Sequence, residues 1–373
     1  GRFDSVMIDY LSGVRFEGDV DAMPEGTVFF PNEPIIRIAA PLPLAQLIET
    51  RIINLLHYQC LVASKAARMV LAAPGKILLD FGLRRAHAGE AGMLAARASY
   101  LAGFTGTATV AAEPVFGVPI FGTMAHSFIQ AHTDEVRAFE DFAHARPEAT
   151  VFLIDTYDTE SAAEKVVSLA PQLRSAGIEV QGVRIDSGDL VAHARKVRAI
   201  LNSGGLPSVK IFASGGLDED DLLRFESEGA PIDGYGIGTS LTTSSDVPAL
   251  DCAYKLQEFE GVPRRKKSEG KETWPGRKQV FRLADADGGV DRDVVALVDE
   301  PAPDGYAPLL QPVMRGGHRV GDPAALDALR DAATRNLAAL PVALREMRPA
   351  PVPSVGVSDG LRDLARQMDA AER

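Results

Sequence analysis

Two glycine-rich segments with hydroxyl side chains follow apolar runs of the chain: FASGG at 212–216 and GIGTS at 236–240. Glycines such as Gly215, Gly216 and Gly238 allow backbone N–H groups to approach an anion closely. Ser214 and Thr239 add hydroxyl donors. One such segment is usually a plain turn, but two of them after consecutive apolar runs favour a site that anchors a phosphate.

A cation and a carboxylate lie two residues apart in VRIDSGDL, as Arg184 and Asp186. On a β-strand this spacing points both side chains to the same face. The pair suits a substrate that has a carboxylate for the arginine and a sugar diol for the aspartate. An internal ion pair is the alternative, and the position at the end of a predicted strand favours ligand binding.

His126 lies in GTMAHSF, after an apolar segment and at the start of a predicted helix. The other six histidines have no comparable setting. Asp155 and Asp158 in LIDTYDT are able to orient an imidazole or to bind Mg²⁺. The alternatives are a structural role for the histidine and, for Asp158, the N-cap of a helix beginning TESAAEKV.

The segment DFGLRRAHAGEAG at 80–92 combines an aromatic ring with two cations. Phe81 at a strand end is able to stack on a flat ring, and Arg84 and Arg85 provide donors for an anion. The Asp-Phe-Gly triplet also occurs in protein kinases. No glycine-rich loop, strand lysine or catalytic-loop motif accompanies it here, which excludes a kinase.

These residues lie on segments that alternate between β and α patterns from residue 76 to 258. The predicted strands are KILLDFG, TATVAAE, VFLIDTYD, VQGVRIDSG, VKIFASGG and IDGYGIGTSL, and the predicted helices span 86–101, 126–143, 160–175, 189–202 and 218–228. Apolar strands that alternate with helices predict an α/β fold with a buried parallel sheet. Chemically useful residues at the strand ends favour an irregular (β/α) TIM-like barrel, with an open doubly wound sheet as the alternative.

The flanking regions have different patterns. Residues 1–75 are predicted to form a small mixed domain with short strands and a helix near 46–69. Residues 259–373 contain predicted strands joined by an Asp-Gly turn at 277–298, a helical segment at 323–346 and a proline-rich extended tail at 346–355. We expect this C-terminal segment to pack back on the N-terminal small domain.

Composition limits the partners. The net charge of −12 argues against nucleic acid and anionic membranes as main partners. No apolar run approaches the roughly 20 residues that cross a bilayer, and the first residues lack the pattern of a secretory signal. Two distant cysteines fit a reducing cytoplasm. A basic cluster at 264–278 is either an anion site or a solvated loop.

Taken in order, the motifs resemble the nicotinate phosphoribosyltransferase family. The motifs are AMPEGTVFFPNEP, DFGLRRAHAGEAGMLAARASYLAGFTGT, VFGVPIFGTMAHSF, LIDTYDT, VRIDSGDL, FASGGLDE, GIGTSL, KKSEGKETWPGRKQVFR, PVMRGGHRV and LPVALREM. The resemblance implies a reaction of nicotinate, phosphoribosyl pyrophosphate and ATP, with Mg²⁺, that yields nicotinate mononucleotide, pyrophosphate, ADP and phosphate. It also implies an irregular α/β barrel at 76–258, a homodimer, and an α/β sandwich domain built from both termini, of which residues 1–75 are the N-terminal part and residues 259–373 the C-terminal part.

The resemblance further implies roles for individual residues. His126 is the histidine that ATP phosphorylates, with Asp158 as its partner. Phe81 stacks on the pyridine ring and Arg184 meets the nicotinate carboxylate. Asp186 binds the ribose hydroxyls. The ribose 5-phosphate is held by Arg84, Ser214, Gly215, Gly216, Gly238 and Thr239.

One position separates related substrates. Nicotinamide phosphoribosyltransferases have an aspartate beside the amide in the segment that matches GFTGTAT, where this chain has Ala108. A carboxylate there would repel nicotinate, so the alanine favours the acid. The family's T-D-x-Y motif, whose tyrosine stacks on the ring, does not occur in this sequence. Quinolinate or nicotinamide phosphoribosyltransferase activity and a non-catalytic nucleotide-binding homologue are the alternatives.

Overall fold

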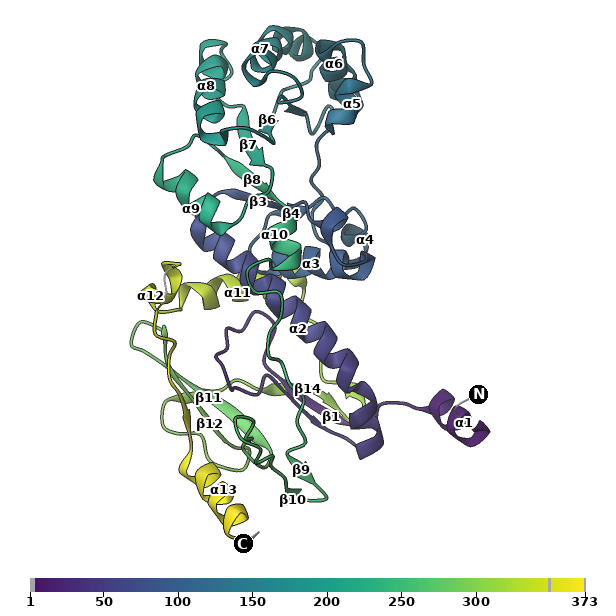
Figure 1. Ribbon diagram of the computed structural model, residues 1–373, viewed down its shortest axis with the longest axis vertical. Helices are drawn as coiled ribbons and strands as arrows, with labels where there is room; N and C mark the ends of the chain where they lie inside the picture. Colours follow the sequence, from purple (N-terminus) through teal and green to yellow (C-terminus); the bar gives the residue numbers. More distant parts are fainter. Residues whose placement is uncertain (1–3, 348–349, 372–373) are drawn as a thin grey trace. The chain divides into compact units, whose positions relative to one another are not determined.

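The computed structural model describes residues 4–347 and 350–371, which divide into two compact units. Unit 1 contains residues up to His57 and from Asp251 onward, and unit 2 contains Tyr58–Leu250. The first division falls within one long helix, α2 (Leu42–Ala72), where the sequence predicts a helix from 46 to 69. Figure 1 shows the helices and strands of both units.

Unit 2 is built on one parallel sheet of six strands, in the order β4-β3-β8-β7-β6-β5 (Figure 1). The strands are β3 (Ile77–Asp80), β4 (Gly106–Thr107), β5 (Val151–Leu153), β6 (Gly182–Ile185), β7 (Lys210–Ser214) and β8 (Gly234–Ile237). Together they make an open, curled half-barrel. The predicted α/β fold with a parallel sheet is therefore confirmed.

The helices of unit 2 alternate with these strands. They are α3 (Gly89–Leu101), α4 (Ala112–Phe116), α5 (His126–Gln130), α6 (Glu135–Ala145), α7 (Thr159–Ser175), α8 (Leu190–Ser203), α9 (Glu219–Ser227) and α10 (Thr239–Thr243), with a short 3₁₀ helix η1 (Leu83–Arg85). Side chains such as Phe152, Val183 and Ile211 are buried between sheet and helices. This burial on both faces explains why the strands are almost wholly apolar.

Three consecutive helices of unit 2 begin in the same way. Asp158 precedes α7, Asp189 precedes α8 and Asp218 precedes α9, and each carboxylate accepts a backbone N–H of the first helical turn. An aspartate at this position satisfies an N–H group that otherwise has no partner in the helix. The three caps fix the residue at which each helix begins after its strand.

Two predicted elements differ from the structure. The strand predicted at 107–113 ends at Thr107, because the Thr107 hydroxyl accepts the Thr109 N–H and the Ala112 N–H then bonds the Thr109 carbonyl, which turns the chain into α4. The helix predicted at 126–143 is divided into α5 and α6, because the Asp134 carboxylate caps a new helix at the Arg137 N–H.

In its described residues, unit 1 combines three small sheets with the first part of α2 and four further helices. The strands are β1 (Asp19–Ala22), β2 (Ile36–Ala39), β9 (Glu258–Phe259), β10 (Val262–Pro263), β11 (Lys278–Ala284), β12 (Val290–Leu297), β13 (Tyr306–Pro308), β14 (Gln311–Arg315), β15 (His318–Arg319) and β16 (Val355–Val357). The helices are α1 (Ser5–Gly13), α11 (Leu326–Ala338), α12 (Val342–Arg345) and α13 (Asp359–Ala371). The sheets have the orders β15-β14-β1-β2, β10-β9 and β13-β11-β12-β16.

The hairpin predicted at 277–298 is confirmed by the antiparallel pair β11 and β12. Its turn is closed by the Asp285 carboxylate, which accepts the N–H groups of Asp287 and Gly289. The helical segment predicted at 323–346 is present as α11 and α12. Of the predicted extended tail, residues 348 and 349 lie outside the described residues, as do residues 1–3 of the N-terminal segment.

The basic cluster at 264–278 is tied to carboxylates and carbonyls within unit 1. Arg265 and Lys267 both pair with Asp369 of α13. Lys278 donates to Gln257 Oε1 and to the carbonyl oxygens of Trp274 and Gly276 at 2.7–2.9 Å, and burial lowers the pKa of its ammonium to about 7. These contacts support a structural role for much of the cluster.

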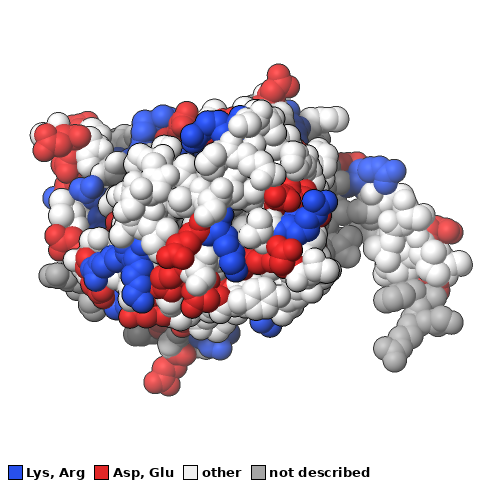
Figure 2. Space-filling view, turned by 90° about the horizontal axis from the view of Figure 1, so that it is seen from above, with Lys and Arg blue, Asp and Glu red and all other residues white. Residues whose placement is uncertain are grey.

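Acidic and basic side chains are interspersed on the face shown in Figure 2. None of the helices in the described ranges combines the length and the apolar character that crossing a bilayer requires.

Candidate functional site

The residues predicted from the strand ends lie along one edge of the parallel sheet of unit 2. In spatial order, Phe81 follows β3, Gly238 follows β8, Ser214 ends β7, Arg184 and Asp186 lie at the end of β6, and Asp155 comes after β5. Because the strands are parallel, their carboxyl ends meet at this edge. The structure therefore brings together side chains that are far apart in the sequence.

Arg184 is the central cation of this edge. Its guanidinium donates to Asp186 Oδ1 at 3.1 Å, to Ser214 Oγ at 3.0 Å and to the Met124 carbonyl at 2.9 Å. Its Nε is buried and donates no hydrogen bond to any described residue. Burial lowers the pKa of Arg184 from its ordinary value, and the charges of Asp186 and Asp155 oppose this effect. A buried guanidinium held in this way is suited to bind an anionic ligand.

Asp186 connects the ends of β6 and β7. Its carboxylate accepts a short hydrogen bond from the Ser214 hydroxyl as well as the bond from Arg184. A side chain at Gly215 would place its Cβ 2.1 Å from the Asp186 carbonyl oxygen, and Gly215 has a φ of +104°. Only glycine fits this close approach of the two strand ends.

The Phe81 ring lies beside the arginine, with the Arg184 guanidinium 5.9 Å from the ring centroid. The ring occupies space that Gly236 of β8 leaves open, because a Cβ at that position would lie 2.4 Å from the ring. A flat aromatic face next to a cation suits an aromatic ligand that carries an anionic group.

His126 begins α5, and its side chain is 40% exposed. Its Nδ1 lies 3.1 Å from the Thr156 hydroxyl, and its Nε2 lies 3.9 Å from Asp155 Oδ1 and 3.8 Å from Asp186 Oδ2. An accessible imidazole between carboxylates is suited to act as a nucleophile or a general base. The structure thus places the histidine next to the residues at the strand ends.

The carboxylate predicted as the partner of His126 makes its contacts elsewhere in this structure. Asp158 is exposed and its carboxylate accepts the Ser161 N–H, which lowers its pKa together with the Ser161 side chain and the charges of His193 and Lys165. The ion-pair partners of His126 among residues 4–347 and 350–371 are Asp155 and Asp186. Asp158 thus has the capping role that was its alternative, and Asp155 is the carboxylate nearest to the imidazole after Asp186.

Asp155 is held rigidly. Its side chain is 2% exposed, and its Oδ2 accepts the Asp186 N–H at 3.0 Å and the Ser187 hydroxyl at 2.6 Å. Its Oδ1 has no hydrogen-bond partner in the described chain and lies on the His126 side. A buried carboxylate oxygen without a donor stabilises a positive charge that develops beside it.

The predicted phosphate residues frame the same edge. Gly216 is exposed just after β7. Thr239 is exposed at the start of α10, and Gly238 precedes this helix. The Ser240 hydroxyl donates a short hydrogen bond to the Leu217 carbonyl, which joins the two glycine-rich turns. Arg84 lies exposed in η1, and its charge adds to the burial that lowers the pKa of Arg184.

Sequence reasoning missed three members of this arrangement. The Met124 carbonyl and the Thr156 hydroxyl contact Arg184 and His126, but nothing in their residue types indicates this role. Gly236 was noted only as part of a glycine-rich segment. Gly236 leaves space for the Phe81 ring because β3 pairs with β8, and in this pairing Leu79 lies opposite Gly236.

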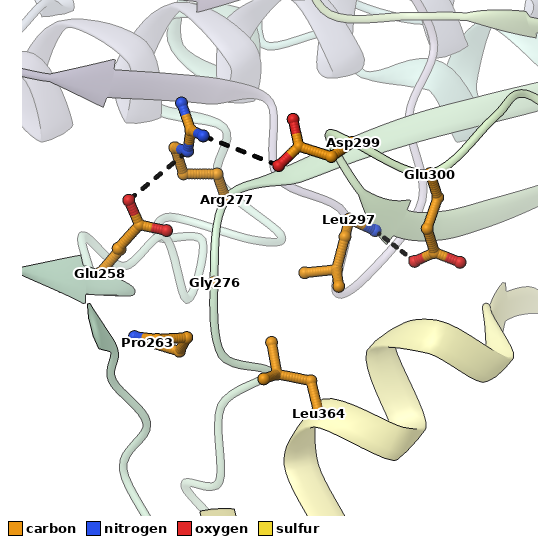
Figure 3. Close-up of a pocket in the computed structure, with 8 residues that line it drawn as sticks. All are labelled: Glu258, Pro263, Gly276, Arg277, Leu297, Asp299, Glu300 and Leu364. Carbon is orange, nitrogen blue, oxygen red and sulfur yellow. Dashed lines mark hydrogen bonds and ion pairs between the residues drawn. The ribbon is translucent and has the colours of Figure 1, made fainter. Parts of the chain in front are cut away.

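A separate cavity of about 290 Å³ lies within unit 1 (Figure 3). Arg277 lies between Glu258 and Asp299, with separations of 3.5 Å and 3.7 Å, and the Glu300 carboxylate accepts the Leu297 N–H. None of the residues at the sheet edge of unit 2 lines it. The chemistry predicted from the sequence is therefore located at the sheet edge and not in this cavity.

Comparison with known proteins identifies the family. The model of the nicotinate phosphoribosyltransferase family matches residues 77–274, and the model of its N-terminal domain matches residues 1–57. The chain belongs to the nicotinate phosphoribosyltransferase family. A Mycobacterium tuberculosis relative named nicotinate phosphoribosyltransferase pncB2 is 48% identical over 348 residues, which cover 93% of this chain and 74% of the relative.

Two solved structures of similar proteins agree with this family membership. The crystal structure of human nicotinic acid phosphoribosyltransferase superposes with a TM-score of 0.87 at 28% identity, covering 98% of this chain and 86% of the other. That of nicotinate-nucleotide pyrophosphorylase from Pyrococcus furiosus gives 0.75 at 28% identity, covering 87% and 81%. The resemblance inferred from the motifs is therefore confirmed for the nicotinate phosphoribosyltransferase family.

Proposed function

We propose that this chain transfers the phosphoribosyl group of phosphoribosyl pyrophosphate to nicotinate, in a reaction coupled to ATP hydrolysis. The products are nicotinate mononucleotide, pyrophosphate, ADP and phosphate. One observation carries the proposal: at one edge of the sheet, the Arg184 guanidinium lies 5.9 Å from the Phe81 ring centroid and donates to Ser214 of the first glycine-rich turn, and the second such turn follows β8, which lies between β3 and β7. Nicotinate has an aromatic ring and a carboxylate, and phosphoribosyl pyrophosphate has phosphate groups, so the three parts of the site match the groups of the two substrates.

Nicotinate is assigned to the space beside Phe81 and Arg184. The pyridine ring stacks on Phe81, and the substrate carboxylate accepts from the Arg184 guanidinium. Ala108 is exposed after β4 and leaves no carboxylate that would repel the substrate's own. These contacts favour the acid over its amide.

The ribose and its 5-phosphate are assigned to the adjacent strands. Asp186 is placed to accept hydrogen bonds from the ribose hydroxyls, and Arg84 provides a cation for the phosphate. The 5-phosphate is held by the two glycine-rich turns through Ser214, Gly215, Gly216, Gly238 and Thr239. With both ends of the substrate anchored, the reacting atoms are aligned without further contacts.

The chemistry of the transfer requires no general base. The pyridine nitrogen already has a lone pair, which forms the new bond to C1 of the ribose as the bond from C1 to pyrophosphate breaks. The sugar acquires positive charge in the transition state, as in glycoside cleavage. The Asp186 carboxylate, which was assigned above to the ribose hydroxyls, lies close to the ribose and stabilises the positive charge on the sugar.

Mg²⁺ is expected to accompany the phosphate groups of the substrates. The described part of the chain contains no cluster of three or more side chains arranged to hold a metal ion. Mg²⁺ commonly binds through one or two carboxylates together with substrate phosphates and water. Asp155, whose Oδ1 has no hydrogen-bond partner among the described residues, and Asp186 are the carboxylates that would contribute, and bound Mg²⁺ would neutralise the leaving pyrophosphate.

ATP is assigned to the exposed face of His126. An imidazole nitrogen attacks the γ-phosphorus and the bond to ADP breaks, which leaves a phosphohistidine that water later hydrolyses to phosphate. Asp155 orients the ring and stabilises its positive charge. Because a phosphohistidine does not take part in the sugar transfer itself, its role is to couple ATP hydrolysis to substrate affinity and product yield.

The wider architecture is also part of the proposal. We assign residues 76–258 to an irregular TIM-like barrel whose parallel strands form the open, curled sheet of unit 2, residues 1–75 to the N-terminal part of an α/β sandwich, and residues 259–373 to a segment that completes it. A homodimer follows from the family resemblance, and a cytoplasmic location follows from that resemblance and from the low cysteine content, two in the sequence.

A turnover assay with nicotinate, nicotinamide and quinolinate, each with and without ATP, tests the function. Product from nicotinate that increases with ATP supports the proposal. Product with release of CO₂ from quinolinate would instead identify a quinolinate phosphoribosyltransferase, an alternative without a phosphorylated histidine. Binding of nicotinate and phosphoribosyl pyrophosphate without product would identify a non-catalytic homologue.

The space beneath Phe81 gives a first prediction. In Gly236→Ala the added methyl group would lie 2.4 Å from the Phe81 ring, so the ring must move. We expect the KM for nicotinate to rise about 10-fold, because a ring displaced by about 1 Å no longer stacks on the substrate. The control is Gly89→Ala, where a Cβ meets no atom within 4 Å. Steady-state kinetics with each substrate varied would contradict the role of Gly236 if both variants matched the wild type.

The two aspartates after β5 give a second prediction. Asp155→Asn should lower the amount of phosphohistidine about 10-fold or more, because the imidazolium loses a buried negative partner. Asp158→Ala should leave phosphorylation unchanged and lower the free energy of unfolding slightly, because the α7 helix loses its N-cap. Labelling with γ-³²P ATP and chemical denaturation measure the two effects. A larger loss of phosphohistidine in Asp158→Ala than in Asp155→Asn would instead identify Asp158 as the partner of His126.

A further inference from the structure

Asp80, the last residue of β3, is a buried carboxylate with no role in the reaction described above. The residue is 1% exposed, and burial raises the pKa of its carboxyl group. Its Oδ1 accepts the Gly82 N–H at 2.8 Å, and its Oδ2 accepts the Thr107 hydroxyl at 2.7 Å. Among the described residues, this carboxylate has no ion-pair partner. Such a group is costly to bury, so its two hydrogen bonds must be well formed.

Thr107 extends this network to the next strand. It is wholly buried at the end of β4, where it pairs with Asp80 in the parallel register. Its hydroxyl donates to Asp80 and accepts the Thr109 N–H at 3.0 Å, so both hydrogen-bonding functions of the hydroxyl are used. The Asp80 carbonyl accepts the Ala108 N–H at 2.8 Å. Two turns are therefore fastened to one carboxylate and one hydroxyl.

The first of these turns carries Phe81. The Phe81 N–H bonds the Ile237 carbonyl of β8 at 2.8 Å, and the Gly82 N–H bonds Asp80, so the backbone on both sides of the C-alpha atom is fixed. The ring lies against Gly236, in space that a side chain at that position would occupy. The second turn carries Ala108, the residue assigned beside the substrate carboxylate.

We propose that Asp80 and Thr107 are positioning residues for the aromatic substrate: the carboxylate–hydroxyl pair between β3 and β4 holds the Phe81 ring and the Ala108 turn at the separation that accepts nicotinate. The pair touches neither the substrate nor the reacting atoms and acts through Phe81 and Ala108. This inference depends on the proposed function, because it concerns the same substrate site.

The test compares Thr107→Val with Thr107→Ser. Valine keeps the shape and the β-branch of threonine but removes the hydroxyl, whereas serine keeps the hydroxyl. Thr107→Val should raise the KM for nicotinate about 10-fold, and the KM for phosphoribosyl pyrophosphate should change less than about twofold. Thr107→Ser should retain the wild-type KM for nicotinate. Thermal denaturation reports any loss of fold separately.

A double-mutant cycle separates positioning from general destabilisation. If the pair acts through the Phe81 ring, then Thr107→Val should add little to the nicotinate KM in a Phe81→Leu background, because the positioned group is already absent. Asp80→Asn, which keeps the size of the side chain, should give the same non-additive result. Additive effects of the two changes on the nicotinate KM would overturn the proposal.

The outcomes separate this inference from the proposed function. A wild-type protein that forms no nicotinate mononucleotide contradicts the proposed function. The positioning role is overturned if the wild type forms product but Thr107→Val leaves the nicotinate KM unchanged. It is also overturned if the KM values for nicotinate and phosphoribosyl pyrophosphate rise together. Either result leaves the proposed function intact.

Discussion

Replacing Arg184 by glutamine is expected to lower kcat/KM for nicotinate about 100-fold, which corresponds to about 2.7 kcal/mol of transition-state stabilisation. The guanidinium is largely buried and already fixed by Asp186, Ser214 and the Met124 carbonyl, so it meets a substrate carboxylate without further ordering. Loss of one partner from a buried charge pair commonly costs several kcal/mol.

The same variant should lose selectivity between nicotinate and its amide. The wild-type arginine distinguishes a carboxylate from a neutral amide by charge, and glutamine does not. Activity with nicotinamide should therefore change much less than activity with nicotinate. Arg184→Lys keeps the charge but loses the planar donor geometry, and we expect an intermediate defect.

Arg174 provides a matched control for this experiment. It lies in the last turn of α7, about half exposed, and pairs with Glu179 at 3.1 Å. Arg174→Gln should leave the kinetic constants unchanged, because an exposed pair contributes little. Equal losses for nicotinate and nicotinamide in Arg184→Gln, or a defect confined to phosphoribosyl pyrophosphate, would contradict the assignment of the carboxylate to Arg184.

The His126→Ala variant should incorporate no acid-labile phosphate from γ-labelled ATP, and its turnover should no longer respond to ATP. The imidazole is the accessible nucleophile at the sheet edge, with Asp155 and Asp186 within 4 Å of its Nε2. The transfer reaction itself does not use the imidazole. We therefore expect a residual activity that equals the rate of the wild type without ATP.

His132 is the control for the phosphorylation experiment. It lies just after α5, where its Nδ1 is 2.7 Å from the Phe128 carbonyl and its Nε2 is 3.4 Å from Asp141. His132→Ala should retain the label and the response to ATP. Label that persists in His126→Ala would show that another residue is phosphorylated, and an ATP response without any label would show that coupling does not need a phosphohistidine.

Much of the parallel sheet could be predicted from the sequence, because its strands are buried on both faces and are therefore continuous apolar runs. The errors occur where side chains redirect the backbone. The strand predicted at 107–113 is short because Thr107 bonds its own neighbouring backbone, and the helix predicted from 126 to 143 is interrupted by the cap at Asp134. Such local hydrogen bonds depend on side-chain geometry and are not visible in an apolar pattern.

The candidate site could be predicted in its parts but not in its contacts. Strand ends indicated Arg184, Asp186, Ser214 and Phe81, and the sheet order brings them together. The choice between Asp155 and Asp158 could not be made from spacing, because both lie in one short loop. Only the structure shows that one caps a helix while the other faces His126.

A crystal structure with bound nicotinate mononucleotide tests the central claim most directly. The account predicts the pyridine ring against Phe81, its carboxylate on Arg184, and the 5-phosphate on the glycine-rich turns after β7 and β8. A nucleotide bound at another part of the molecule, for example in the cavity of unit 1, or a phosphate distant from both turns, would contradict it.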